Sequence, residues 1–225
     1  MCFNAEVSIN TFIFSLFAAI FAFFNKVISI DIFLFILSFA IMQLVEWLAW
    51  NIINSGQKVV TGFIAYLFPI VTVVIQPIVA ALVFNTQYKT VVARIGEKWA
   101  GIAKKVIYTA ILCLWIYTVY DYIWVGHRPN VYKSEINGHL KWNLFHDFNL
   151  FEGTLIFVSY LLAYLLPMIL SLPYIMAVIF IVTFVYSFVT YLHAKTWGTI
   201  WCYSANLISL VIITQVFWKN FCSSI

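Results

Sequence analysis

Residues 27–53 read VISIDIFLFILSFAIMQLVEWLAWNII, an apolar run with only two charged side chains, Asp31 and Glu46. A run of this kind matches or exceeds the ~17–25 residues that cross the ~30 Å hydrocarbon core of a bilayer. No water is available in hydrocarbon, so a spanning segment must satisfy its own backbone hydrogen bonds, as a helix does. The stretch therefore predicts a transmembrane helix.

Six further apolar runs of similar length occur along the chain, and none shows the alternation of a membrane β-barrel strand. Of the 225 residues, 64% are hydrophobic and 9% are charged, whereas a soluble domain carries roughly 25% charge. We predict an all-α fold, a polytopic bundle of seven transmembrane helices forming a single integral membrane domain over 1–225. The predicted helices are 8–24, 27–53, 59–84, 106–125, 150–166, 173–192 and 200–217.

Two parts of this assignment depend on local signals. The first run lacks a preceding basic residue and a small-residue cleavage site, so we interpret it as a retained helix and not a signal peptide. The fifth and sixth helices are separated at Pro167 and Pro173, which bracket a tight turn in which one proline ends a helix and the other opens the next.

The basic residues predict the orientation. An odd number of helices places the termini on opposite sides of the membrane. One side would collect Lys26, Lys89, Arg94, Lys98, Lys104, Lys105 and Lys219, and the other would collect Lys58, Arg128, Lys133, Lys141 and Lys195. Because cytoplasmic loops carry the excess of Lys and Arg, we expect a cytoplasmic C-terminus and an extracytoplasmic N-terminus.

The segment 88–103 places apolar residues at helical spacing, with basic residues elsewhere around the helix. This pattern predicts an interfacial helix that lies on an anionic leaflet. The alternative is a solvated linker that carries the positive charge of the cytoplasmic side.

Polar residues inside the predicted helices are the candidate functional groups. Glu46 lies about six residues past the centre of its helix, roughly 9 Å along the axis. An ionised carboxylate at that depth costs on the order of 2–3 kcal/mol, so it should face the bundle with a partner or stay protonated. Gln43 and Trp50 share its face at helical spacing.

The predicted topology brings further polar residues to the same outer half of the bundle. Asp121 lies past the centre of the fourth helix, His193 ends the sixth, and Asn206 lies in the seventh near Cys202. We therefore predict a buried polar cluster of Gln43, Glu46, Asp121, His193 and Asn206. Pro77, deeper in the third helix, frees a carbonyl one turn back that could bind a cation or water.

The connection 126–149 would cover this outer face. It carries His127, His139, His146 and Asp147, and its Asn137-Gly138 pair is a turn signal that favours a short hairpin. Two interpretations are open, a lid over the cluster and a solvated loop.

Three short motifs lie far apart in the chain: MCFNAEVS at the start, QLVEW in the second helix, and WGTIWCYSAN before the last. Together they resemble a family of small seven-helix membrane proteins of bacteria and large DNA viruses. That family's pattern is Met-Cys-(Phe/Trp)-Asn, then Gln-x-x-Glu, then Gly-(Ser/Thr)-x-Trp-Cys. The matching residues are Cys2, Asn4, Gln43, Glu46, Gly198, Thr199, Trp201 and Cys202. The resemblance implies the fold and membrane residence, and it supplies no activity.

The cysteines allow three roles. Cys2 and Cys202 would both lie at the outer surface, where an oxidising compartment could join them in a disulfide. Cys2 could instead become an N-terminal thiol nucleophile after removal of Met1. A third role is metal ligation by Cys2, Cys202 and His193, although no compact Cys/His spacing supports zinc. We interpret Cys113 as core filler and Cys222 as a tail thiol.

Several functions are excluded by missing motifs. The last helix has no buried lysine for a retinal Schiff base, since Lys219 lies at its inner end, and the chain has no phosphate-binding loop or hydrolase elbow. Its net charge of +4 does not indicate nucleic-acid binding. The expected partners are the lipid bilayer, a small ion or solute, and a possible homo-oligomer, with no cofactor and no metal.

Three functional classes remain. The first is a transporter or channel in which Glu46 and Asp121 form a proton or cation relay. The second is a structural or interaction protein whose buried polar residues hold helices together. The third is an intramembrane lipid-modifying enzyme that would use His193, Glu46 and a metal. The sequence offers no clear nucleophile or three-ligand metal set, so it favours a protein that is not an enzyme without excluding this class.

Overall fold

A computed structural model of the chain describes residues 4–146, 150–198, 201 and 206–222. Within these residues, six helices are long and apolar enough to cross a membrane: Ala5–Phe24, Ile30–Asn54, Gly62–Thr86, Glu97–Trp124, Phe151–Ser171 and Tyr174–Tyr191. The apolar helix Leu207–Phe221 is shorter. These helices confirm the predicted all-α membrane bundle. They do not confirm the predicted number of seven spans.

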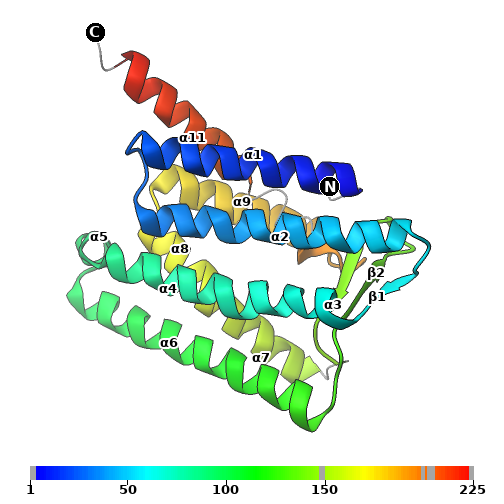
Figure 1. The fold of residues 1–225 in the computed structure, drawn as a ribbon. Helices are drawn as coiled ribbons and strands as arrows, with labels where there is room; N and C mark the ends of the chain where they lie inside the picture. The colour runs from blue at the N-terminus through cyan, green and yellow to red at the C-terminus, as the bar shows by residue number, and fades with distance from the viewer. Residues whose placement is uncertain (1–3, 147–149, 199–200, 202–205, 223–225) are drawn as a thin grey trace.

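The helices pack in two layers (Figure 1). The front layer contains α1 (Ala5–Phe24), α2 (Ile30–Asn54), α3 (Gly62–Pro69) continued by α4 (Gln76–Thr86), and α6 (Glu97–Val119). The rear layer contains α7 (Leu150–Tyr160), α8 (Leu166–Ser171), α9 (Tyr174–Tyr191) and α11 (Leu207–Phe217). The helices of the front layer occur in the order of the chain, and each packs beside the next one.

Three of the long helices contain a π-helical segment in the part of the chain that the structure describes: Ile70–Ile75, Tyr120–Trp124 and Leu161–Leu165. Another, Trp218–Cys222, follows α11. Two of the segments come just before a proline, Pro77 or Pro167. Because proline lacks an N–H and disturbs the preceding turn, a wide π turn accommodates it without ending the helix. The predicted helix end at Pro167 is therefore wrong, and the turn lies at Leu172–Pro173.

The predicted interfacial helix 88–103 is divided in the structure. The short helix α5 (Tyr88–Ile95) ends at Gly96, whose φ is 83°, and α6 begins at Glu97 and runs on into the membrane span. Glycine adopts a positive φ without steric cost, so the chain turns sharply here. A single helix over this segment is therefore a wrong prediction.

Arg94 fixes α5 against the turn between α8 and α9. Its Nη1 donates hydrogen bonds to the carbonyls of Leu170 and Leu172, each 2.8 Å long. Its guanidinium also lies 4.5 Å from the centre of the Tyr174 ring. A cation at the carbonyl end of a helix stabilises both the unpaired carbonyls and the helix dipole.

A small antiparallel sheet closes one end of the bundle. Its strands are β1 (Val59–Val60), β2 (Asn130–Lys133) and β3 (Leu140–Asn143), in that order. The hairpin predicted at Asn137-Gly138 is confirmed, since β2 pairs with β3 on either side of it. We call this end, which also holds the first turn of α1, the sheet end, and the opposite end, with residues 25–29, α5 and the α8–α9 turn, the basic end.

The hairpin is packed onto the bundle and is not a solvated loop. Val131 and Leu140 are fully buried, and the ring of His139 lies edge-on to Tyr191 at the end of α9. Asn137 Nδ2 donates a 2.8 Å hydrogen bond to Thr196 Oγ1. The hairpin thus covers the sheet end.

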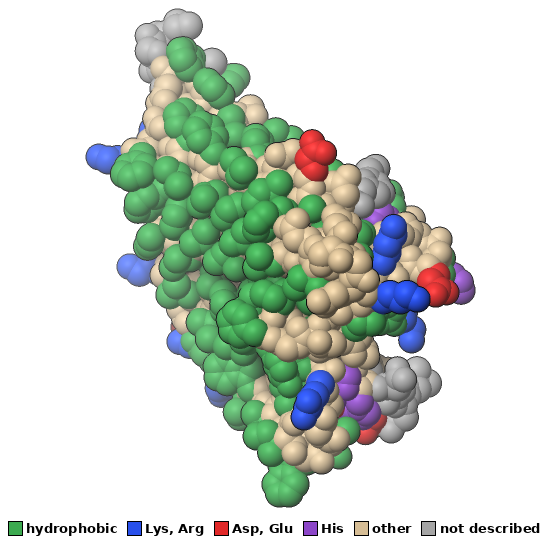
Figure 2. Space-filling model, turned by 45° about the vertical axis from the view of Figure 1, so that its right-hand side comes forward, with side chains coloured by type: hydrophobic (Ala, Val, Ile, Leu, Met, Phe, Trp, Pro, Cys, Tyr) green, Lys and Arg blue, Asp and Glu red, His purple; other side chains and the backbone are tan. Residues whose placement is uncertain are grey.

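Figure 2 shows hydrophobic side chains over the middle of the visible face, with basic side chains at one margin and a mixture of basic, acidic and histidine side chains at the sheet end. Many large apolar residues are exposed on the helices, such as Ile116 on α6 and Val189 on α9. A soluble protein rarely exposes apolar patches of this extent, whereas a lipid-facing surface requires them.

Candidate functional site

Asp121 forms a polar contact that joins the end of α6 to the segment after β3. It lies in the π-helical segment at the end of α6, it is fully buried, and its Oδ1 is hydrogen-bonded to Nδ1 of His146. His146 follows β3 and its side chain is 25% exposed. On the other side of the imidazole, Nε2 lies 3.9 Å from Oε2 of Glu152 on α7, which is 34% exposed. These three residues connect the surface with a buried carboxylate.

Aromatic rings surround this contact. The hydroxyl of Tyr117, one turn before Asp121, lies 3.5 Å from His146 Nδ1, and the two rings are stacked. Tyr122 donates a 2.9 Å hydrogen bond to the carbonyl of Leu144 and so holds the segment after β3 against α6. The second carboxylate oxygen of Asp121 is buried and has no hydrogen-bond partner among the described residues.

Gln43 and Glu46 form a second polar pair, on α2. Both are fully buried, and Gln43 Nε2 donates a 3.2 Å hydrogen bond to Glu46 Oε2. Trp50, which shares their face, is also buried. The predicted position of Glu46 inside the bundle thus agrees with the burial of its side chain.

The two remaining members of the predicted cluster differ in burial. Asn206 is buried and accepts a 2.7 Å hydrogen bond from Ser15 Oγ, which joins α11 to α1. His193 is exposed, because α9 ends at Tyr191 and His193 lies in the turn beyond it. Its assignment to a buried cluster is therefore wrong. The partner of Asp121 is His146, in the connection after β3. The sequence placed His146 only in a lid or a solvated loop.

The carbonyl freed by Pro77 is occupied by a side chain. In a regular helix this carbonyl belongs to Val73, four residues earlier, and its oxygen accepts a 3.1 Å hydrogen bond from the indole Nε1 of Trp115 on α6. The predicted cation or water site is thus taken by Trp115. Next to Pro77, the fully buried Gln76 accepts a 3.4 Å hydrogen bond from the hydroxyl of Tyr160.

The cysteine predictions fall mostly outside the described residues, which include neither Cys2 nor Cys202, nor Thr199 and Asp147. Cys113 is exposed on α6, so its interpretation as core filler is wrong. The part of the chain that the structure covers contains no group of three or more His, Cys, Asp or Glu that could hold a metal ion.

Several motif residues have a packing or capping role. Asn4 caps α1, since its Oδ1 accepts a 2.9 Å hydrogen bond from the N–H of Val7. Trp201 is 1% exposed and lies among aromatic rings. A Cβ added at Gly198 would lie 3.0 Å from Cζ3 and 3.3 Å from Cε3 of Trp142 on β3. Glycine at this position therefore permits the hairpin to approach.

We expect Gly198→Ala to destabilise the protein by about 1–3 kcal/mol, because the added methyl group would displace the Trp142 ring. Gly101→Ala is the matched control. Gly101 lies in α6 with nothing within 4 Å of an added Cβ, and alanine there should stabilise the helix by about 0.5–1 kcal/mol. Thermal unfolding in detergent would measure both effects. Equal melting temperatures for the two variants would contradict a close contact at Gly198.

For Glu46 we expect that Glu46→Gln leaves the stability nearly unchanged, since the side chain keeps its shape and an oxygen that can accept from Gln43. Glu46→Ala should destabilise the bundle by about 1–2 kcal/mol, because a buried hydrogen-bond acceptor is lost. Unfolding of the two variants in the same detergent would test this. A Glu46→Gln protein as unstable as Glu46→Ala would show that the carboxyl group itself is required.

The fold and this site define a helical, multi-pass integral membrane protein with a carboxylate–imidazole pair at one end. The sequence matches no family model, and comparisons with curated proteins and with solved structures give no match.

Proposed function

We propose that the chain is a small seven-helix transporter or channel that moves protons, alone or with a small ion or solute. The proton would enter through Glu152, His146 and Asp121. The seventh span would include Leu207–Phe221, which is apolar and packs beside α1 and α9. The buried carboxylate of Glu46 would be a second proton-binding group along the path.

The orientation proposed for the chain places the N-terminus outside and the C-terminus in the cytoplasm. It is supported by the excess of basic residues toward the basic end, where they follow α1, lie in α5 and the first part of α6, and occur in the last π-helical segment: Lys26, Lys89, Arg94, Lys98, Lys104, Lys105 and Lys219. In this orientation the sheet end faces the outer aqueous phase. His146, which is partly exposed there, would then receive its protons from outside.

The observation that carries the proposal is the contact of buried Asp121 with partly exposed His146. A neutral imidazole carries a proton on one ring nitrogen and accepts one at the other. A proton that arrives at Nε2 from Glu152 therefore allows Nδ1 to give its proton to Asp121. Ionisable groups inside membrane spans are costly and mark such pathways, and π-helical segments such as the one that holds Asp121 occur often at functional sites.

A structural or interaction role is the second candidate, favoured by the filled aromatic interior. The rings of Phe39, Tyr164, Phe180 and Trp201 lie within 5.2–6.3 Å of one another. In this interpretation the polar pairs only join helices.

The test is proton flux into liposomes that contain the purified chain. A potassium diffusion potential would drive the flux, and a pH-sensitive dye inside the liposomes would report it. The proposal expects acidification above that of protein-free liposomes. Acidification equal to the protein-free rate, with a solute-free buffer and across a panel of small ions and solutes, would favour the structural role.

A further inference from the structure

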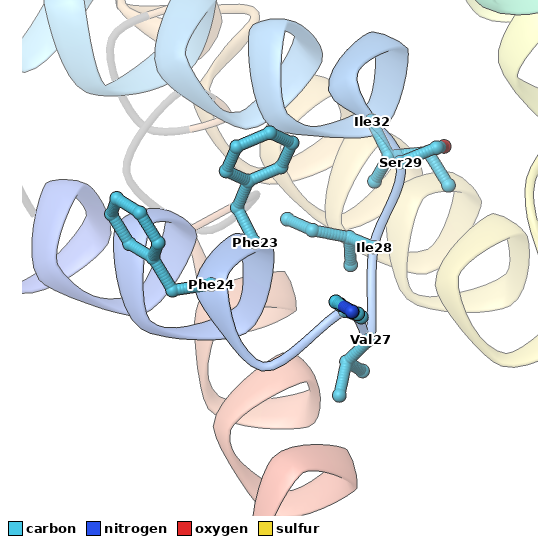
Figure 3. Close-up of a pocket in the computed structure, with 7 residues that line it drawn as sticks. Phe23, Phe24, Val27, Ile28, Ser29 and Ile32 are labelled. Carbon is cyan, nitrogen blue, oxygen red and sulfur yellow. The ribbon is translucent and has the colours of Figure 1, made fainter.

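An open groove of about 650 Å³ lies at the basic end, where α1 turns into α2 (Figure 3). Its apolar wall consists of Phe23, Phe24, Val27, Ile28 and Ile32. The two polar residues that line it are Lys26 and Ser29. This volume falls within the ~300–1,000 Å³ of known small-molecule sites. The groove thus offers an apolar surface beside a cation.

The backbone at Lys26 is unusual for a lysine. The end of α1 is closed by hydrogen bonds from Lys26 N–H to Phe23 O and from Val27 N–H to Ala22 O, both 3.0 Å long, with Lys26 at a φ of 54°. This Schellman arrangement favours glycine at the residue of positive φ, because a side chain there is strained. Gly56 and Gly96 have positive φ after α2 and α5. Lysine is uncommon at such a position, and here its side chain is one of the two polar groups that line the groove.

A second cation is fixed beside the same turn. Lys219 Nζ donates hydrogen bonds to the carbonyls of Asn25, at 3.0 Å, and Lys26, at 3.1 Å. The acidic residue in the first turn of α2, Asp31, is 2% exposed and accepts hydrogen bonds from Thr86, at 2.5 Å, and Gln87, at 3.3 Å. Its carboxylate is therefore directed at the end of α4, whereas Lys26 lines the groove and Lys219 contacts the turn.

We propose that this groove binds an anionic phospholipid of the surrounding leaflet. The headgroup lies at Lys26, near the charge of Lys219, and one acyl chain lies along Phe23, Phe24 and Ile32. The groove occurs where two apolar helices leave the hydrocarbon, which is the depth of the lipid headgroups. An anionic head joined to an apolar chain matches both parts of the groove, whereas a free anion would leave its apolar wall in water. The proposal does not depend on proton transport.

Lys26→Asn is the first test variant, because asparagine tolerates the left-handed conformation and the substitution removes only the charge and length of the side chain. Lys195→Asn is its matched control. Lys195 also ends a helix with a positive φ, of 55°, and its N–H donates to Leu192 O, but it lies after α9 at the sheet end. Both variants should unfold at or above the wild-type temperature.

The wild-type protein and the two variants would be incubated in detergent with equal amounts of phosphatidylglycerol and phosphatidylcholine, and the retained lipid measured by native mass spectrometry. We expect the wild-type protein to prefer phosphatidylglycerol. Lys26→Asn should lower its retention about five-fold, the factor for one lysine near an anionic headgroup. Lys195→Asn should leave retention unchanged. Equal retention by Lys26→Asn and wild type, or an equal loss in Lys195→Asn, would overturn the proposal.

The apolar half of the site has its own test. Phe24 is 78% exposed, so Phe24→Ala should fold normally and still lose part of the phosphatidylglycerol retention with both lysines present. Phe17→Ala, on the same helix and 58% exposed but outside the groove, should keep the wild-type retention. If Phe24→Ala also retains the lipid fully, or if the wild-type protein holds phosphatidylcholine equally well, no phospholipid binds in the manner proposed.

Discussion

Replacing Asp121 with asparagine is expected to lower proton flux into liposomes by roughly 100-fold, the scale of a lost acid–base group, while the protein stays folded. The amide has the shape of the carboxyl group and can still accept a hydrogen bond from His146 Nδ1, but it cannot take up the proton. His146→Gln should produce a similar loss, because the amide cannot carry a proton from one side to the other. The dye-loaded liposomes described above provide the measurement.

Glu135→Gln is the matched control for these two variants. Glu135 is exposed in the hairpin at the same end of the bundle, and its substitution makes the same chemical change away from the buried carboxylate. It should keep the wild-type flux. Wild-type flux in Asp121→Asn would remove Asp121 from the path, and wild-type flux in both Asp121→Asn and His146→Gln would exclude the relay.

The membrane spans were predictable because hydropathy depends on local composition alone. The runs 27–53 and 59–84 correspond to the helices Ile30–Asn54 and Gly62–Thr86, displaced by a few residues. The fourth span starts much earlier than the predicted residue 106, because α6 continues through Lys104 and Lys105. Such side chains can place their charges at the interface while their stems lie along the helix, so charge alone does not mark the helix end.

The polar contacts were predictable only where they are local. Gln43 and Glu46 are three residues apart on one helix, and their contact follows from helical spacing. The partner of Asp121 depends on how the hairpin docks on the bundle. That docking rests on contacts between residues distant in the chain, such as the rings of Phe68 and Trp142, whose centres are 5.3 Å apart. The spacing of residues within one segment does not predict such contacts.

Trp201→Ala should cause a large loss of stability, about 3–5 kcal/mol. The indole is 1% exposed, and its ring centre lies 4.9 Å from that of Phe184, 5.2 Å from that of Phe180 and 5.7 Å from that of Tyr164. Lipid is as apolar as the bundle interior, so this loss comes from van der Waals contacts and from the cavity left among rigid rings, not from exposure to water.

The loss of stability at position 201 should depend on the size of the side chain that replaces tryptophan. Trp201→Phe keeps an aromatic ring among its neighbours and should cost less than Trp201→Ala, whereas Trp99→Ala, at a residue that is 61% exposed, should cost little. Thermal and denaturant unfolding in one detergent would rank the three variants. If Trp201→Ala were no less stable than Trp99→Ala, the aromatic cluster would not hold the rear layer against α2. A Trp201→Ala protein that is strongly destabilised but retains its flux when folded would separate the packing role of this motif residue from the proton path at Asp121.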